Sequence, residues 1–332
     1  MKLSFRMPDA DAPNAFQATP FALFAICLAF LGLGLCWRLA PYPDGIGHLF
    51  GEAILGVGYI FTGAAFLCQA LRLLWFPRTV LDELDDPIRG PIALQMVIAL
   101  QLIAESLTEV LPELAEVLVL VTSCVALLAS PLMLTVWRRH PGYYQLQTPT
   151  WLIPGISIGI ASFLCGIHSW MTSSKFLLAL TILWFAAHAV GSLSRDQRLP
   201  VPDPARPLFL IFHAPVPILY LSWLQAQGDG VIAMALLSVA SAISVFLCVW
   251  SVHKLRAPFG YPWWAAGMPP MVLVLALFAP RSEGSDIWLF AAVALVAFIG
   301  VHLAFLCLFL ATIWAALRRK MLPLPFITRS YF

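Results

Sequence analysis

The chain has 332 residues, of which 61% are hydrophobic and only 11% are charged, and its mean hydropathy is +0.88. An ordinary soluble domain carries roughly 25% charged residues, so this composition excludes a soluble globular protein and predicts a polytopic protein embedded in the lipid bilayer. The formal net charge is only +2. The basic residues flank apolar segments, where their ordinary role is anchoring at the lipid headgroups and topology, and we expect no nucleic-acid partner.

Ten segments are long and apolar enough to cross a membrane, a task that needs about 20 residues of helix. They lie at 14–38, 47–75, 91–109, 113–137, 149–168, 171–193, 207–225, 229–254, 262–280 and 284–317. The polar start, MKLSFRMPDADAP, has no apolar run before a cleavage site and does not resemble a signal peptide. Because every connection is short, we predict one transmembrane domain over residues 1–332 with short tails.

Basic residues gather on one side of this topology. Placing the N-terminus in the cytoplasm leaves only Arg38, Lys175 and Arg281 on the outer side, out of 19 Lys and Arg residues. Lys and Arg are enriched in the cytoplasmic connections of membrane proteins. We therefore predict a multi-pass protein of the cell (inner) membrane with cytoplasmic N- and C-termini.

Prolines interrupt alternate spans. The first, fifth, seventh and ninth spans contain Pro20, Pro154, Pro215 and Pro269 with Pro270, whereas the third has no interior proline. A proline inside a helix removes a backbone hydrogen bond, which a membrane tolerates where the freed group meets protein or water. We predict an all-α fold of five helical hairpins, with odd-numbered inner helices lining a central pore and even-numbered outer helices facing lipid. Prolines that only kink helices for packing are the alternative.

Five short motifs occur along the chain, one at or near the start of each odd-numbered span. They are TPFALF at 19–24, DDPIRG at 85–90, PTWLIPG at 149–155, HAP at 213–215 and WAAGMPP at 264–270. Together with ten spans, they resemble the tellurite-resistance and dicarboxylate transporter family, which includes bacterial TehA-type channels and plant guard-cell slow anion channels. The resemblance implies a homotrimer of independent pores, each with five inner and five outer helices, that conducts small anions.

The resemblance also implies a gate in the ninth span. Family members carry a phenylalanine there, commonly followed by proline or glycine, whose ring closes the pore. Aligning Trp264 and Pro269 with this pattern puts Met268 at the gate position, and a slip of one residue would put Gly267 there. Methionine is apolar and flexible, so we expect a softer constriction, with a space-filling core methionine as the alternative. Gly155 and Trp264 are further candidates for the pore wall.

Ionisable residues are rare inside the odd spans. Lys and Arg are lacking at depth, and the interior groups are Glu105 in the third span and His213 in the seventh. Conduction needs weak, multiple contacts rather than tight binding. The sequence therefore favours a channel for small monovalent anions such as chloride or nitrate, without proton coupling. We predict that Glu105 and His213 line the pore or modulate it; a solvated vestibule for Glu105 and a packing role for His213 are the alternatives.

The alternative function is a proton-coupled carrier that transports C4-dicarboxylates, such as malate, or sulfite. A tellurite-resistance protein is a further alternative. A dicarboxylate site is expected to contain a buried Arg or Lys, which the odd spans lack. The seven cysteines form no CxxC pair, and neither HExxH nor a P-loop occurs. We therefore predict no enzyme activity, no cofactor and no metal. Intramembrane histidines as haem ligands are the alternative, but they lack a paired pattern on facing helices.

Overall fold

Ten helical stretches of the described chain are long and apolar enough to span a membrane, as predicted. The computed structural model describes residues 19–40, 45–140, 147–198, 203–254, 257, 259–279 and 288–317, and no strand occurs among them. The spans are Phe21–Leu39, Ile46–Trp75, Gly90–Leu107, Pro112–Trp137, Pro149–Ile167, Met171–Ser192, Ala205–Gln227, Val231–Ser251, Tyr261–Phe278 and Phe290–Leu317. The predicted span ends at 14–18 and 284–287 lie outside the described residues.

The spans alternate between a buried and an exposed class. In an 18-residue window of each odd-numbered span, 67% to 89% of the residues are buried, against 22% to 33% in the even-numbered spans. A transmembrane helix that is apolar but exposed faces lipid, whereas one that is covered by its neighbours lies inside the bundle. The predicted inner and outer layers are confirmed.

Each inner span begins as a 3-10 helix and continues as an α-helix. The pairs are η1 (Phe21–Leu23) with α1 (Phe24–Leu39), η3 (Gly90–Leu94) with α4 (Gln95–Leu107), η5 (Pro149–Leu152) with α6 (Ile153–Ile167), η6 (Asp203–His213) with α8 (Pro215–Gln227), and η7 (Tyr261–Ala266) with α10 (Met268–Phe278). Packing contacts run from α1 to α4, α6, α8, α10 and back to α1, and the 3-10 segments make the same cycle. The inner spans therefore form a closed ring.

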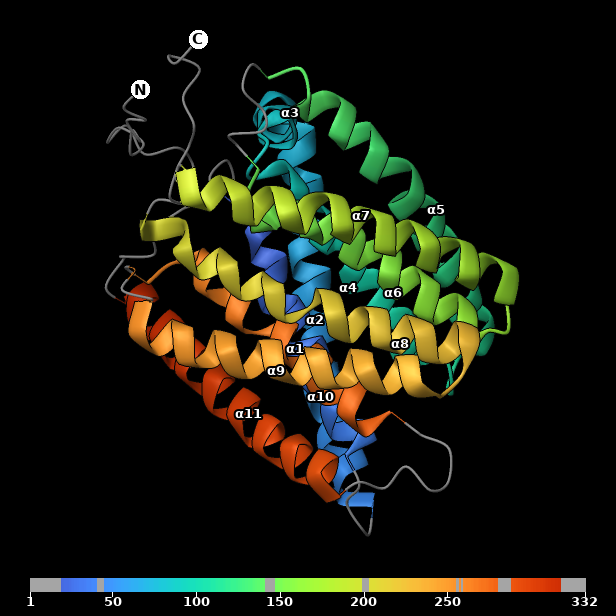
Figure 1. The fold of residues 1–332 in the computed structure, drawn as a ribbon. Helices are drawn as coiled ribbons and strands as arrows, with labels where there is room; N and C mark the ends of the chain where they lie inside the picture. The colour runs from blue at the N-terminus through green and yellow to red at the C-terminus, as the bar shows by residue number, and fades with distance from the viewer. Residues whose placement is uncertain are drawn as a thin grey trace.

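Five long helices surround this ring. They are α2 (Ile46–Trp75), α5 (Pro112–Trp137), α7 (Met171–Arg198), α9 (Val231–Lys254) and α11 (Trp288–Leu317). Each packs against the inner helix that precedes it in the chain, which completes a hairpin, and also against the next inner helix around the ring. In Figure 1, α7 and α9 lie in front of other helices of the bundle, and α11 runs along its edge. Each outer helix thus covers one seam of the ring.

The prolines stand where 3-10 segments become α-helices. Pro154 is the second residue of α6, Pro215 the first of α8 and Pro269 the second of α10. The first turn of an α-helix has unpaired N–H groups, so a residue without one fits there at little cost. These prolines begin α-helices instead of kinking their middle. The prediction that Pro20 lies inside the first span is wrong, because Pro20 precedes η1 as its N-cap.

The third span has the same construction without a proline at the junction. Its 3-10 segment starts with Gly90 and Pro91, after the short helix α3 (Pro77–Asp85). A Cβ on Gly90 would lie 2.4 Å from the carbonyl oxygen of Leu84, so the chain can approach α3 this closely only with glycine. The missing interior proline therefore does not mark a different architecture.

A buried ion pair joins α2 to α3, and its carboxylate also binds the start of the first span. Arg72 Nη1 lies 2.6 Å from Glu83 Oε2, and the two side chains are 3% and 2% exposed. The other carboxylate oxygen of Glu83 accepts a hydrogen bond from the backbone N–H of Phe21 at 3.2 Å. Gln69 donates to the carbonyl of Thr19 at 3.2 Å. These contacts fix the beginning of the inner ring against α2.

Candidate functional site

A cavity of about 180 Å³ lies inside the ring, and all five inner spans contribute to its wall. The wall consists of Leu39 from the first span, Leu102 and Glu105 from the third, Ile160, Phe163, Leu164 and Ile167 from the fifth, Ile218, Leu221 and Gln225 from the seventh, and Met268, Val272, Leu275 and Ala279 from the ninth. About 15 Å³ is enough for one water. The cavity therefore has room for a small ion with part of its water shell.

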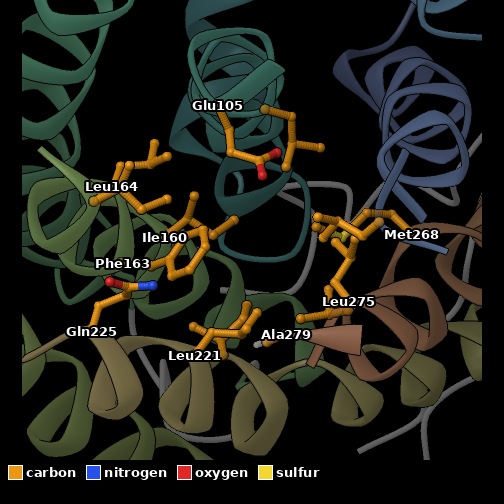
Figure 2. A pocket seen from close by; sticks show the side chains of 14 residues that line it. Glu105, Ile160, Phe163, Leu164, Leu221, Gln225, Met268, Leu275 and Ala279 are labelled. Carbon is orange, nitrogen blue, oxygen red and sulfur yellow. The ribbon is translucent and has the colours of Figure 1, made fainter. Parts of the chain in front are cut away.

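The wall of this cavity is almost entirely apolar. Among the lining residues only Glu105 and Gln225 have polar side chains, and none is Lys or Arg. Figure 2 shows the Glu105 carboxylate directed into the hollow, opposite the apolar side chains of α6 that include Phe163. A bound anion would meet weak dispersion contacts and one carboxylate, with no basic side chain to hold it.

Met268 lies at the end of the cavity that is nearest to the 3-10 segments, where α10 begins. It is 5% exposed and is the lining residue nearest to the 3-10 segment of its span. A Cβ built on Gly32 of α1 would lie 3.7 Å from Met268 Cγ and 3.2 Å from the sulfur of Met271, so both methionines pack on this glycine. Figure 2 shows the Met268 side chain extending from α10 to the hollow. This position is compatible with the predicted gate and with space filling alike.

Three other predicted wall residues turn away from the cavity. Gly155 packs closely against α7, because a Cβ built on it would lie only 2.6 Å from Trp184 Cδ1. The indole N–H of Trp264 donates to Thr312 on α11 at 3.1 Å, and its ring is 1% exposed. Gly267 packs against α1. These residues serve close packing between helices, and none of them lines this cavity.

His213 also faces an outer helix. Its Nδ1 lies 3.1 Å from the hydroxyl of Ser244 on α9, and the residue is 2% exposed. His213 is absent from the lining of the central cavity. The expected pore-lining position is therefore not found, and a modulating role stays a prediction.

Arg38 has a structural role that the sequence did not indicate. Its Nε and Nη2 donate to Glu52 Oε1 at 2.9 and 2.5 Å, and its Nη1 donates to the carbonyl of Ser106 at 2.6 Å. The Ser106 hydroxyl is 2.8 Å from the hydroxyl of Tyr59. The network joins α1, α2 and α4 directly beside Glu105, with the guanidinium charge compensated by Glu52. The one sequence feature that could have indicated this network is the position of Arg38, a lone arginine at the end of an apolar span.

The stretch GISIG at 155–159 fits the GxSxG pattern of hydrolases. Its serine lies inside α6 instead of at a strand-to-helix turn, where such a nucleophile is exposed. Ser157 is fully buried, and its hydroxyl donates to Gln101 Oε1 at 3.3 Å. The serine therefore has a packing role. In the described part of the chain no group of three His, Cys, Asp or Glu residues is arranged to hold a metal ion.

The ring of helices around a cavity agrees with a comparison of the sequence with known families. Residues 18–313 match the SLAC1 family, described as voltage-dependent anion channel. The chain belongs to this family. It is accordingly a membrane anion channel or transporter, and the resemblance carried by the five motifs is confirmed. A comparison with curated proteins found no match.

Proposed function

We propose that the chain conducts small monovalent anions, such as chloride and nitrate, along the axis of the five-helix ring. The observation that carries this proposal is the central cavity, to which every inner span contributes and whose lining residues include no basic side chain. A largely apolar wall without a basic side chain binds an anion weakly, and weak binding allows the ion to leave as readily as it arrives. Rapid flow of easily dehydrated anions is the expected result.

Met268 is proposed as the constriction of this path. It is supported by its place at the inner end of the cavity and by its packing on Gly32. A narrow apolar stretch of a pore stops ions by excluding water, and three side-chain torsions allow a methionine to move aside more easily than an aromatic ring. Opening would then require only a change of side-chain rotamer or a small shift of α10.

Helix termini are the proposed source of mild attraction for anions. The α-helical parts of the inner spans begin inside the bundle, at Gln95, Ile153, Pro215 and Met268. The N-terminus of an α-helix carries a partial positive charge, equivalent to about half an elementary charge. Such partial charges stabilise an anion without the tight binding that Lys or Arg would cause.

A proton-coupled carrier is the second candidate, and Glu105 favours it. A carboxylate that faces a transport cavity is able to bind and release a proton, and ionisable residues inside membranes often act in coupling. The carrier would transport C4-dicarboxylates or sulfite. Dependence of transport on a pH gradient separates the two candidates.

The assembly and orientation are also proposals. The asymmetric distribution of Lys and Arg supports an inner-membrane protein with both termini in the cytoplasm. The family resemblance supports a homotrimer with one pore in each subunit. On this orientation the cavity, which is lined by the later parts of the inner spans, opens toward the outer side.

The test is anion flux from liposomes that contain the purified protein. Chloride, nitrate and malate are compared, each with and without a pH gradient, and protein-free liposomes are the control. We expect chloride and nitrate to leave down their gradients at rates that do not require a pH gradient. Saturating malate transport that requires a pH gradient would establish the carrier instead.

A further inference from the structure

A second hollow, of about 830 Å³, lies over α10 on the outer surface of the bundle. One side is formed by α9, with Ser241, Ser244 and Val245, and the other by α11, with Val296 and Gly300. Val245 and Val296 are 63% and 71% exposed, so the hollow opens to the surroundings of the bundle. We call it the α9–α11 groove. Since α9 and α11 are outer, apolar spans, its surroundings are the hydrocarbon of the bilayer.

The helix α10 separates the α9–α11 groove from the central cavity. Met268, Val272 and Leu275 line the cavity, whereas Pro270 and Leu273 line the groove. Successive residues of an α-helix are about 100° apart, so the first three residues share one face and the other two lie on the opposite face. The wall between the groove and the proposed ion path is one helix thick. That helix carries the proposed constriction.

The polar groups of the groove are already bonded within the protein. The hydroxyls of Ser241 and Ser251 donate to backbone carbonyls of α9, both at distances below 3 Å. Ser244 is paired with His213 at 3.1 Å. No Asp, Glu, Lys or Arg is among the residues that line the groove. The surface of the groove that is left to contact an occupant is therefore apolar, and it favours a hydrocarbon chain over a charged headgroup.

The volume of the groove suits a single flexible chain. Small-molecule sites fall between about 300 and 1,000 Å³, and the 830 Å³ of the groove lies within this range. A flexible acyl chain can follow the groove between α9 and α11, and its apolar carbons match the apolar lining.

We propose that the α9–α11 groove binds an acyl chain of a membrane lipid and that this chain, by filling the space behind α10, sets the position of Met268. The binding site stands independently of the proposed function, whereas its effect on conduction rests on that function. An occupied groove holds α10 toward the cavity. An empty groove leaves α10 free to move outward, away from the ion path.

The test uses a filled groove and a matched control. A Cβ added to Gly300 meets no atom within 4 Å, so Gly300→Phe places a ring in the groove without a clash at the backbone. Gly63→Phe is the control, because Gly63 lies on the exposed face of α2 with the same free space and outside the groove. The full-length variants are reconstituted with a phosphatidylethanolamine that carries a photoreactive diazirine in the middle of one acyl chain. Labelled peptides are mapped by mass spectrometry.

We expect labelling of the groove faces of α9 and α11 to exceed that of the exposed face of α5 several-fold. Gly300→Phe should abolish this excess and Gly63→Phe should retain it. Equal labelling of all outer helices, or cross-links between two copies at the groove in place of lipid, would overturn the site. Anion flux is measured on the same liposomes. Because the added ring occupies the groove whether or not lipid is bound, Gly300→Phe should lower flux relative to both wild type and Gly63→Phe, and unchanged or raised flux in Gly300→Phe overturns the coupling.

Discussion

Replacing Glu105 by glutamine removes the formal negative charge from the wall of the central cavity and keeps the shape of the side chain. Among the residues that line this cavity, Glu105 is the one Asp or Glu, and its carboxylate points into the hollow. A monovalent anion that passes the cavity comes close to this group. Under the proposed function, Glu105→Gln is therefore expected to increase anion flux.

The size of the increase follows from Coulomb's law. Two like charges about 4 Å apart repel each other by about 1 kcal/mol in water and by about 4 kcal/mol at an effective dielectric constant of 20. The figure for water is the smaller of the two, and we take it as the minimum. A difference of about 1 kcal/mol corresponds to roughly a fivefold change in rate. Salt screens such interactions, and the increase should be larger at low ionic strength.

The assay is chloride efflux from liposomes at low and high salt. Glu109→Gln is the matched control, because Glu109 lies one turn further along the chain, is exposed and does not line the cavity. We expect a roughly fivefold increase for Glu105→Gln and little change for Glu109→Gln. An unchanged or lower flux in Glu105→Gln, or an equal increase in both variants, would refute the reasoning.

Two further predictions concern the constriction and the inner ring. Met268→Phe should reduce the single-channel conductance and Met268→Ala should keep or raise it, because the first fills and the second empties the end of the cavity; unchanged conductance in both would remove Met268 from the constriction. Arg72→Met should destabilise the protein by about 3–5 kcal/mol, because it leaves Glu83 buried without its partner. The exposed Arg78→Met, compared by thermal unfolding in detergent, should change stability by less than about 0.5 kcal/mol, and a similar loss in both would contradict this account.

The number of spans and their two layers could be predicted from the sequence because both depend on composition alone. Apolar runs of membrane length mark the spans. The concentration of small residues and prolines in alternate spans marks the inner layer, since close helix packing and irregular backbone both require protein neighbours. The burial of the odd spans, between 67% and 89% of a window, reflects this difference.

The residues of the cavity wall could not be predicted in the same way. The inner helices are apolar on all sides, so periodicity does not show which face points to the ring axis. In α6, Gly155 packs against α7, whereas Ile160 lines the cavity, and nothing in the local sequence distinguishes them. The same ambiguity placed Trp264 and His213 on the pore wall in the prediction, although both face outer helices.

The prolines show a further limit of sequence patterns. A proline is compatible with an interior kink and with the first turn of a new helix. Only the backbone shows that Pro154, Pro215 and Pro269 begin α-helices after 3-10 segments. It also shows that the third span makes the same transition between Leu94 and Gln95, without a proline at the junction.

The central proposal, that anions pass through the cavity inside the ring, is tested most directly by blocking that cavity. Leu275→Cys places a thiol on the wall, and Leu114→Cys places one on the exposed start of α5, both in a protein whose exposed cysteines are replaced. Current across a planar bilayer is recorded before and after a bulky water-soluble thiol reagent is added. The account predicts that the reagent abolishes current through Leu275→Cys and leaves Leu114→Cys unchanged. Undiminished current in Leu275→Cys, with modification of the thiol verified by mass spectrometry, would contradict it.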